Sequence, residues 1–150
     1  FVFFGLINTT KGPKVIEYNV RMGDPETEVV IPRLETDIID LFVAMHNGTL
    51  DEISVAVNPQ TAATVMAVSG GYPGAYEKGK VILGLRDFEG TTVYHAGTKS
   101  GDEITTSGGR VMAFTSFGTD KDEALAKSYA ALKEVSYEGI NYRTDIGFDL

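Results

Sequence analysis

From residue 53 to residue 118 the sequence repeats short β-like runs that are separated by glycine-rich turns. Each run is rich in β-branched and aromatic residues, which favour strands. Short strands at regular spacing predict a compact β-rich unit. The runs are ISVAV, ATVMAVS, KVILGL, TTVYHAG, DEITTS and RVMAFTSFG.

One helix is expected to interrupt this unit. Thr119, followed three positions later by Asp122, resembles a capping box, which marks a helix start. Apolar residues then recur at helical spacing and predict a stripe that faces the core. The stripe consists of Ala124, Leu125, Tyr129, Leu132 and Val135. A mixed segment, residues 137–150, follows.

The first residues predict an antiparallel hairpin. Residues 1–7 are typical of a buried strand, residues 8–13 (NTTKGP) of a turn, and residues 14–19 of a second strand. Because Phe1 opens within a strand pattern and no initiator Met is present, we expect the chain to be a fragment of a larger protein.

Two helices are predicted next. Asp24 before Pro25 indicates an N-cap with proline at the first helical position. Val29 and Val30 are expected to face the core until Pro32 breaks the run.

The second helix is predicted to start at Thr36 or Asp37 and to end at Gly48, a C-cap glycine. Its apolar stripe is Ile38, Leu41, Phe42 and Met45. We expect a domain boundary near residues 48–52, with one unit over 1–49 and a β-rich unit over 50–150.

The composition excludes several classes of function. A net charge of −8 argues against a nucleic-acid binder, which needs a basic face. The absence of cysteine excludes disulfides and thiolate metal sites, and it fits a cytoplasmic protein. Apolar runs are all shorter than the ~18 residues of a membrane span.

The stretch VIEYNVRMGDPE, residues 15–26, carries the main candidate site. In a strand, Glu17, Asn19 and Arg21 share one face, because alternate residues point the same way. Carboxylate and amide oxygens suit Mg²⁺, and a guanidinium clamps phosphate or carboxylate. The other face, Tyr18, Val20 and Met22, is expected to point toward a core. From spacing alone, a solvated strand face with an Arg–Glu pair explains the pattern equally well.

These residues belong to the first of several segments that resemble one protein family, and the segments extend over the whole chain. VIEYNVRMGDPETEVVIPRL, SGGYPGAYEKGKVI, VYHAGT, TSGGRVMAFTSFG and YRTDIG occur here in order. They resemble the phosphoribosylamine–glycine ligases, also called glycinamide ribonucleotide synthetases, of the ATP-grasp superfamily. The resemblance implies an α+β fold: the C-terminal part of an ATP-grasp domain, with antiparallel strands and helices, followed by a small β-rich domain with one long helix.

The resemblance also implies an activity and its residues. It implies ATP-dependent ligation of glycine to 5-phosphoribosylamine through glycyl phosphate, in purine biosynthesis. Glu17 and Asn19 match magnesium (or manganese) ligands, and Arg21 matches an arginine beside the metals. Asp24 and Glu26 match acidic residues that would orient Arg21 or the glycine amine; for Asp24, helix capping is an equal alternative.

Glycine-rich stretches offer weaker candidates. Gly70 and Gly71 could donate backbone N–H groups to a phosphate, although a plain turn explains their pattern better. SGGR, 107–110, is typical of a hairpin turn, and Arg110 is more simply structural than a phosphate ligand.

The histidines and the tail are expected to be structural. His95 is a lone histidine on a strand, and His46 lies on the predicted second helix. Arg143 and Asp145 are expected to pair with each other rather than line a cleft.

Three hypotheses follow, in order of preference. The first is a fragment of the ligase, inactive alone, binding Mg²⁺ weakly at most, from a monomeric parent. The second is another ATP-grasp carboxylate–amine ligase. The third is a non-enzymatic β-rich interaction module. We further expect no membrane partner, and self-association of the fragment through its open apolar edge.

Overall fold

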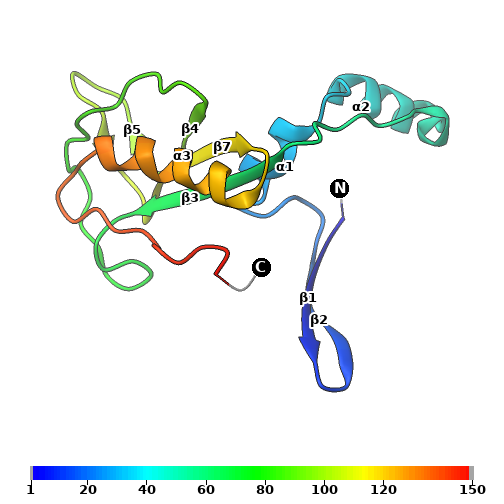
Figure 1. Cartoon of the computed structure of the whole chain (residues 1–150), viewed down its shortest axis with the longest axis horizontal. Coiled ribbons are helices and arrows are strands. Elements are labelled where there is room, and N and C mark those ends of the chain that lie inside the picture. Colours follow the sequence, from blue (N-terminus) through cyan, green and yellow to red (C-terminus); the bar gives the residue numbers. More distant parts are fainter. Residues whose placement is uncertain (1, 149–150) are drawn as a thin grey trace.

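Strands β1 (Phe3–Thr9) and β2 (Gly12–Asn19) form the predicted antiparallel hairpin. They belong to a computed structural model that describes residues 2–148. The hairpin projects away from the remaining elements (Figure 1). The prediction that its first strand is buried is wrong for the described residues, since Phe4 and Leu6 are 55% and 58% exposed. Two strands alone cannot cover each other's faces, and within residues 2–148 no other helix or strand makes an extensive contact with this pair.

Helix α1 (Thr27–Arg33) begins later than the sequence predicts. Its N-cap is Glu26, whose side chain makes no capping bond, so the predicted N-cap role of Asp24 is wrong. The main chain forms a turn instead: Thr27 donates its N–H to the Gly23 carbonyl at 3.0 Å and its hydroxyl to the same oxygen at 2.7 Å. Pro32 lies inside the last turn, so the helix ends one residue after it.

Helix α2 (Ile38–Asn47) confirms both predicted ends. The Asp37 carboxylate accepts from the Ile39 N–H at 2.8 Å, and Gly48 adopts a left-handed φ of 73°. The predicted core stripe is wrong in extent, since Ala44 alone is buried and Met45 is 61% exposed. The helix lies at the far end of the molecule from the main sheet, followed by the 3-10 turn η1 (Leu50–Glu52) (Figure 1).

The β-rich unit is built on a three-stranded antiparallel sheet. Its order is β3 (Thr61–Val68), β7 (Arg110–Gly118) and β4 (Thr91–His95), so the last strand in sequence is central. A separate pair, β5 (Thr98–Lys99) and β6 (Thr105–Thr106), lies beside it.

Two predicted runs are not strands. ISVAV and KVILGL contribute isolated bridges, Leu34 to Val57 and Leu83 to Ser136 among them. Leu34 is the C-cap of α1 and Ser136 lies just after α3, while Val81 of KVILGL bridges Thr105 of the two-residue strand β6; each of these bridges is a single pair.

Helix α3 (Lys121–Glu134) covers one face of the sheet and α1 lies on the other. Val65, Ala67 and Phe114 are fully buried against Leu132 of α3. Burying a side chain such as Leu132 contributes roughly 1.5–3 kcal/mol. On the opposite face, burial and then the charge of Glu28 in α1 raise the pKa of Tyr94.

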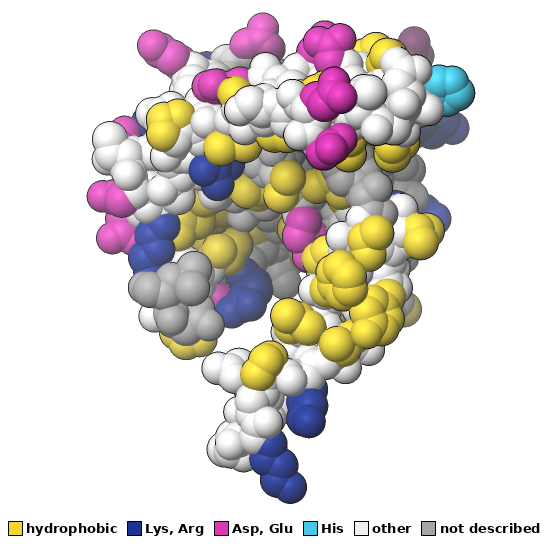
Figure 2. All heavy atoms as spheres, turned by 90° about the vertical axis from the view of Figure 1, so that its right-hand side faces the viewer, with side chains coloured by type: hydrophobic (Ala, Val, Ile, Leu, Met, Phe, Trp, Pro, Cys, Tyr) yellow, Lys and Arg dark blue, Asp and Glu magenta, His cyan; other side chains and the backbone are white. Residues whose placement is uncertain are grey.

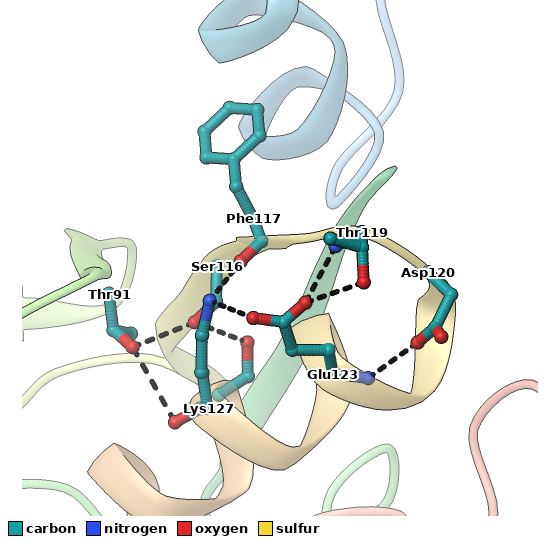
Figure 3. Close-up of polar contacts among 8 residues, drawn as sticks. Thr91, Ser116, Phe117, Thr119, Asp120, Glu123 and Lys127 are labelled. Carbon is teal, nitrogen blue, oxygen red and sulfur yellow. Dashed lines mark hydrogen bonds and ion pairs between the residues drawn. The ribbon is translucent and has the colours of Figure 1, made fainter. Parts of the chain in front are cut away.

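The start of α3 lies one residue later than predicted. Asp120, not Thr119, is the N-cap, and its carboxylate accepts from the Glu123 N–H at 2.9 Å. Glu123 in turn accepts from Thr119 and pairs with Lys127 at 2.7 Å (Figure 3). The bond from Lys127, and then those from Thr119, lower the pKa of Glu123 to about 2. Asp120 displaces Thr119 because a carboxylate accepts more strongly at this helix end.

A buried hydroxyl cluster joins α3 to the sheet (Figure 3). The Thr91 and Ser116 hydroxyls lie 2.7 Å apart, and Ser128 donates to Ser116 at 3.0 Å. These bonds satisfy polar groups that would be costly to bury unpaired.

The segment after α3 returns along β3. Asn141 exchanges main-chain hydrogen bonds with Val68, and the Tyr137 hydroxyl donates to the Val68 carbonyl at 3.0 Å. Burial raises the pKa of Tyr137. The predicted α+β class is confirmed: antiparallel strands, short helices and one long C-terminal helix. Among the described helices, none has the length and apolar character needed to cross a bilayer.

Candidate functional site

Strand β2 presents Glu17 and Asn19 on one face of the hairpin. Glu17 lies opposite Gly5 and Asn19 opposite Phe3. The register shifts beside this pair, leaving Ile16 as a bulge residue just before Glu17. Bulges re-aim neighbouring side chains and recur beside functional sites.

Arg21 lies beyond the strand, which ends at Asn19. The predicted three-residue strand face is therefore wrong in its third member. Arg21 sits in a bend, where its Nη1 donates to the Met22 carbonyl at 3.2 Å. The expectation of a core on the opposite face fails within residues 2–148, because Tyr18 is 66% and Val20 89% exposed.

The side-chain oxygens of Glu17 and Asn19 fit a magnesium ion whose other ligands are phosphate oxygens and water. Glu17 and Asn19 make no side-chain hydrogen bond or ion pair with the described residues, so their oxygens are available. Among residues 2–148, no three or more acidic, histidine or cysteine side chains lie together in a way that could hold a metal ion. Mg²⁺ commonly takes one or two protein oxygens and completes its shell with water and substrate phosphates.

The turn after the bend folds tightly on itself. The Glu26 carboxylate covers Gly23, where an added Cβ would lie 2.0 Å from Glu26 Oε2. Asp24 points instead to the β-rich unit: its main-chain carbonyl accepts from Arg110 Nη1 at 2.9 Å, and its carboxylate lies 3.4 Å from Nη2. Sequence reasoning missed this pair, since no local signal links residues 86 positions apart.

A cavity of about 550 Å³ lies between this turn and the β-rich unit. Pro25 forms one wall, β3 contributes Met66, and Tyr72 and Tyr142 contribute two rings. Figure 2 shows the hollowed face that carries the hairpin and α2, with hydrophobic side chains within it. Apolar walls with a few polar groups are typical of small-molecule sites.

Arg143 pairs with Asp145 as expected, but it also lines this cavity, so the expectation that it would not line a cleft is wrong. It holds Asp145 through Nε and Nη2 at 2.9 and 3.0 Å. The hydrogen bond from Arg143 lowers the pKa of Asp145.

The glycine turn after β3 has structural reasons for its glycines. A Cβ on Gly70 would lie 2.8 Å from the Gly139 carbonyl. Gly71 has a φ of +94°, and a Cβ there would lie 2.2 Å from the Ala75 carbonyl. These contacts explain both residues without a ligand, and the phosphate contact stays a prediction.

In the part of the chain that the structure describes, neither histidine belongs to a group of side chains that could hold a metal ion. His95 shares a 2.9 Å hydrogen bond between its Nδ1 and the Thr98 hydroxyl, and His46 is exposed in α2. Both agree with the structural roles expected from the sequence.

Comparison with known proteins relates this chain to one family. Residues 62–149 match the family described as phosphoribosylglycinamide synthetase, C domain. A protein named phosphoribosylamine–glycine ligase from Vibrio parahaemolyticus is 42% identical over 99% of this chain and 35% of its own length. One of the same name from Rhizobium meliloti is 47% identical over 98% of this chain and 36% of its own.

A solved structure agrees. The crystal structure of phosphoribosylamine–glycine ligase from Thermotoga maritima has a TM-score of 0.82 and 33% identity, covering 96% of this chain and 36% of that one. The chain thus spans about a third of the length of the relatives it matches.

Proposed function

Because the chain belongs to the phosphoribosylglycinamide synthetase C-domain family, we propose that it forms the C-terminal part of a phosphoribosylamine–glycine ligase. The observation that carries this is the match over 99% of the chain to a protein of that name. The enzyme would join glycine to 5-phosphoribosylamine with ATP, in purine biosynthesis in the cytoplasm.

The proposed reaction has two steps. A carboxylate oxygen of glycine attacks the γ-phosphorus of ATP, and ADP leaves with the electron pair of the broken P–O bond. The amine of phosphoribosylamine then attacks the acyl carbon of glycyl phosphate. Inorganic phosphate leaves, the amine loses a proton to solvent, and glycinamide ribonucleotide forms.

The hairpin residues would act on the phosphates. Glu17 and Asn19 would hold Mg²⁺ or Mn²⁺, which neutralises phosphate charge when bound. Arg21 would bind an oxygen of the transferring phosphoryl group and stabilise the charge that develops there. The exposure of Arg21 beyond the strand end supports this role, because its guanidinium can reach a ligand placed over the hairpin.

We propose that the 150-residue chain is inactive alone and binds Mg²⁺ weakly. Two protein oxygens on an exposed hairpin leave most of the coordination shell to water. The remaining two-thirds of a monomeric ligase would supply the adenine contacts and cover the hairpin.

The test uses the full-length protein and follows ADP release with Mg-ATP, glycine and freshly made phosphoribosylamine. We expect release that needs both substrates and falls at least ~10²-fold in Glu17→Ala and Asn19→Ala. Glu89→Ala, an exposed carboxylate in a turn, is the matched control and should match the wild type. Release with a different amine in place of phosphoribosylamine would assign another carboxylate–amine ligation. Absence of ATP turnover would refute the enzyme.

A further inference from the structure

Arg110 fastens the turn after the hairpin to the central strand of the β-rich unit. It is the first residue of β7, and its two Nη atoms reach the main-chain carbonyl and the carboxylate of Asp24. A planar guanidinium that makes two contacts fixes both the distance and the orientation of its partner.

The base of Arg110 is itself held firmly. The preceding Gly109 carbonyl accepts from the Ser69 N–H at 2.8 Å, and the Ser69 hydroxyl donates to Gly108 at 2.8 Å. Gly109 lies against the Tyr72 ring, where an added Cβ would be 2.1 Å from Cδ2. The guanidinium therefore extends from a preorganised turn, and its position is set by the β-rich unit.

The partner segment leads directly to the candidate ligands. Asp24 lies three residues after Arg21 and five after Asn19. Among residues 2–148, no layer of other elements covers the hairpin. The orientation of the face that carries Glu17 and Asn19 therefore depends on how residues 22–26 are held. Both partners are about 40% exposed, so this clasp contributes more to placement than to global stability.

We propose that Arg110 is a positioning residue for the ligation reaction, which holds residues 22–26 so that Arg21 and Asn19 face the substrates. This inference rests on the proposed function. Displacing a reacting constellation by about 1 Å costs ~10²-fold in rate, so the effect falls on kcat rather than on substrate affinity.

The activity test compares three variants of the full-length protein. We expect Arg110→Ala to lower kcat about 10²-fold with KM values within about threefold, and Arg110→Lys to lower it about 10-fold because an ammonium cannot make both contacts. Arg86→Ala is the control: Arg86 pairs with Glu134, the last residue of α3, and that end of α3 lies on the other side of the molecule from the hairpin (Figure 1), so kcat should be unchanged. A kcat within twofold of wild type in Arg110→Ala, or an equal loss in Arg86→Ala, overturns the inference.

A second measurement separates this inference from the proposed function. Hydrogen exchange at the Thr27 amide, which donates to Gly23, reports the order of the turn in the 150-residue chain. Arg110→Ala should raise that exchange rate about 10-fold while exchange in the buried strand β7 is unchanged. If the wild type releases no ADP, the ligase proposal fails. Unchanged hydrogen exchange at the Thr27 amide in Arg110→Ala overturns the positioning role, whether or not the wild type releases ADP.

Discussion

The glycine turn after β3 allows a direct test of whether its residues are structural. We compare Gly71→Ala with Gly79→Ala. Both glycines have left-handed φ values, +94° and +79°. They differ in space: a Cβ at 71 would lie 2.2 Å from the Ala75 carbonyl, whereas a Cβ at 79 meets nothing within 4 Å.

The two substitutions share one cost and differ in another. Placing alanine at positive φ costs roughly 1–2 kcal/mol, and the stiffer unfolded chain returns about 0.4–1 kcal/mol. Gly79→Ala should therefore destabilise by about 1 kcal/mol. Gly71→Ala adds the steric conflict, worth roughly 1–3 kcal/mol, so we expect about 2–4 kcal/mol in total.

The assay is urea unfolding of the 150-residue chain, followed by tyrosine fluorescence and far-UV circular dichroism. An unchanged m-value with a lower midpoint reports a loss of stability. A Gly71→Ala variant within 0.5 kcal/mol of Gly79→Ala, a margin of about the error of such comparisons, would refute the steric argument. Because no nucleotide is present, a large loss would show that the turn needs this glycine independently of any phosphate.

Three further predictions concern charge and exposure. Glu123 has a folded pKa of about 2 against 4.5 for its unfolded value, so it stabilises the fold above about pH 4.5 and loses that effect as the pH falls toward 2. The midpoint temperature of thermal unfolding of Glu123→Gln should therefore be lower than that of the wild type at pH 6, and the two midpoints should converge near pH 2. A difference in midpoint that stays constant with pH would contradict this. Glu28 Oε2 is buried without a hydrogen-bond partner in the described chain. Because a neutral amide costs less to desolvate than a carboxylate, Glu28→Gln should raise the free energy of unfolding, measured in urea, by about 1 kcal/mol. A lower free energy of unfolding would show that the carboxylate is needed. The chain should self-associate through its apolar hairpin, and Tyr18→Lys with Val20→Lys should reduce this in sedimentation velocity; a single monomer boundary for the wild type at high concentration would contradict it.

Local sequence signals located most elements of the fold. The signals for the Asp37 cap, the Gly48 C-cap and α3 lie within a few positions of one another, as do those for the hairpin turn, which the structure narrows from the predicted 8–13 to residues 10–11. Their physical causes are short-range, namely backbone conformation and capping bonds, so the sequence contains them fully. The error at Thr119 was a choice between adjacent capping residues, whereas at Asp24 a main-chain turn closed by Thr27 and Gly23 replaces a side-chain cap.

Burial was predicted less well than element type. Apolar runs in the hairpin and α2 indicate surfaces that need cover, but they do not say which segment provides it. Within residues 2–148 no element covers them, and Phe4, Val20 and Met45 are exposed. The apolar run of β7 is of the same kind, but it is buried because α3 packs on one face of the strand and α1 on the other.

The sequence by itself determined the chemistry available at the site: a carboxylate at 17, an amide at 19 and a guanidinium at 21, with alternate strand positions joining the first two. Only the tertiary structure decided that Arg21 leaves the strand and that Arg110 clasps Asp24 across 86 positions. Such a contact depends on the packing of a whole sheet, which places β7 beside a turn far away in the chain. Local sequence patterns do not encode the contact between Arg110 and Asp24, because many other side chains could occupy either position at little cost in local free energy.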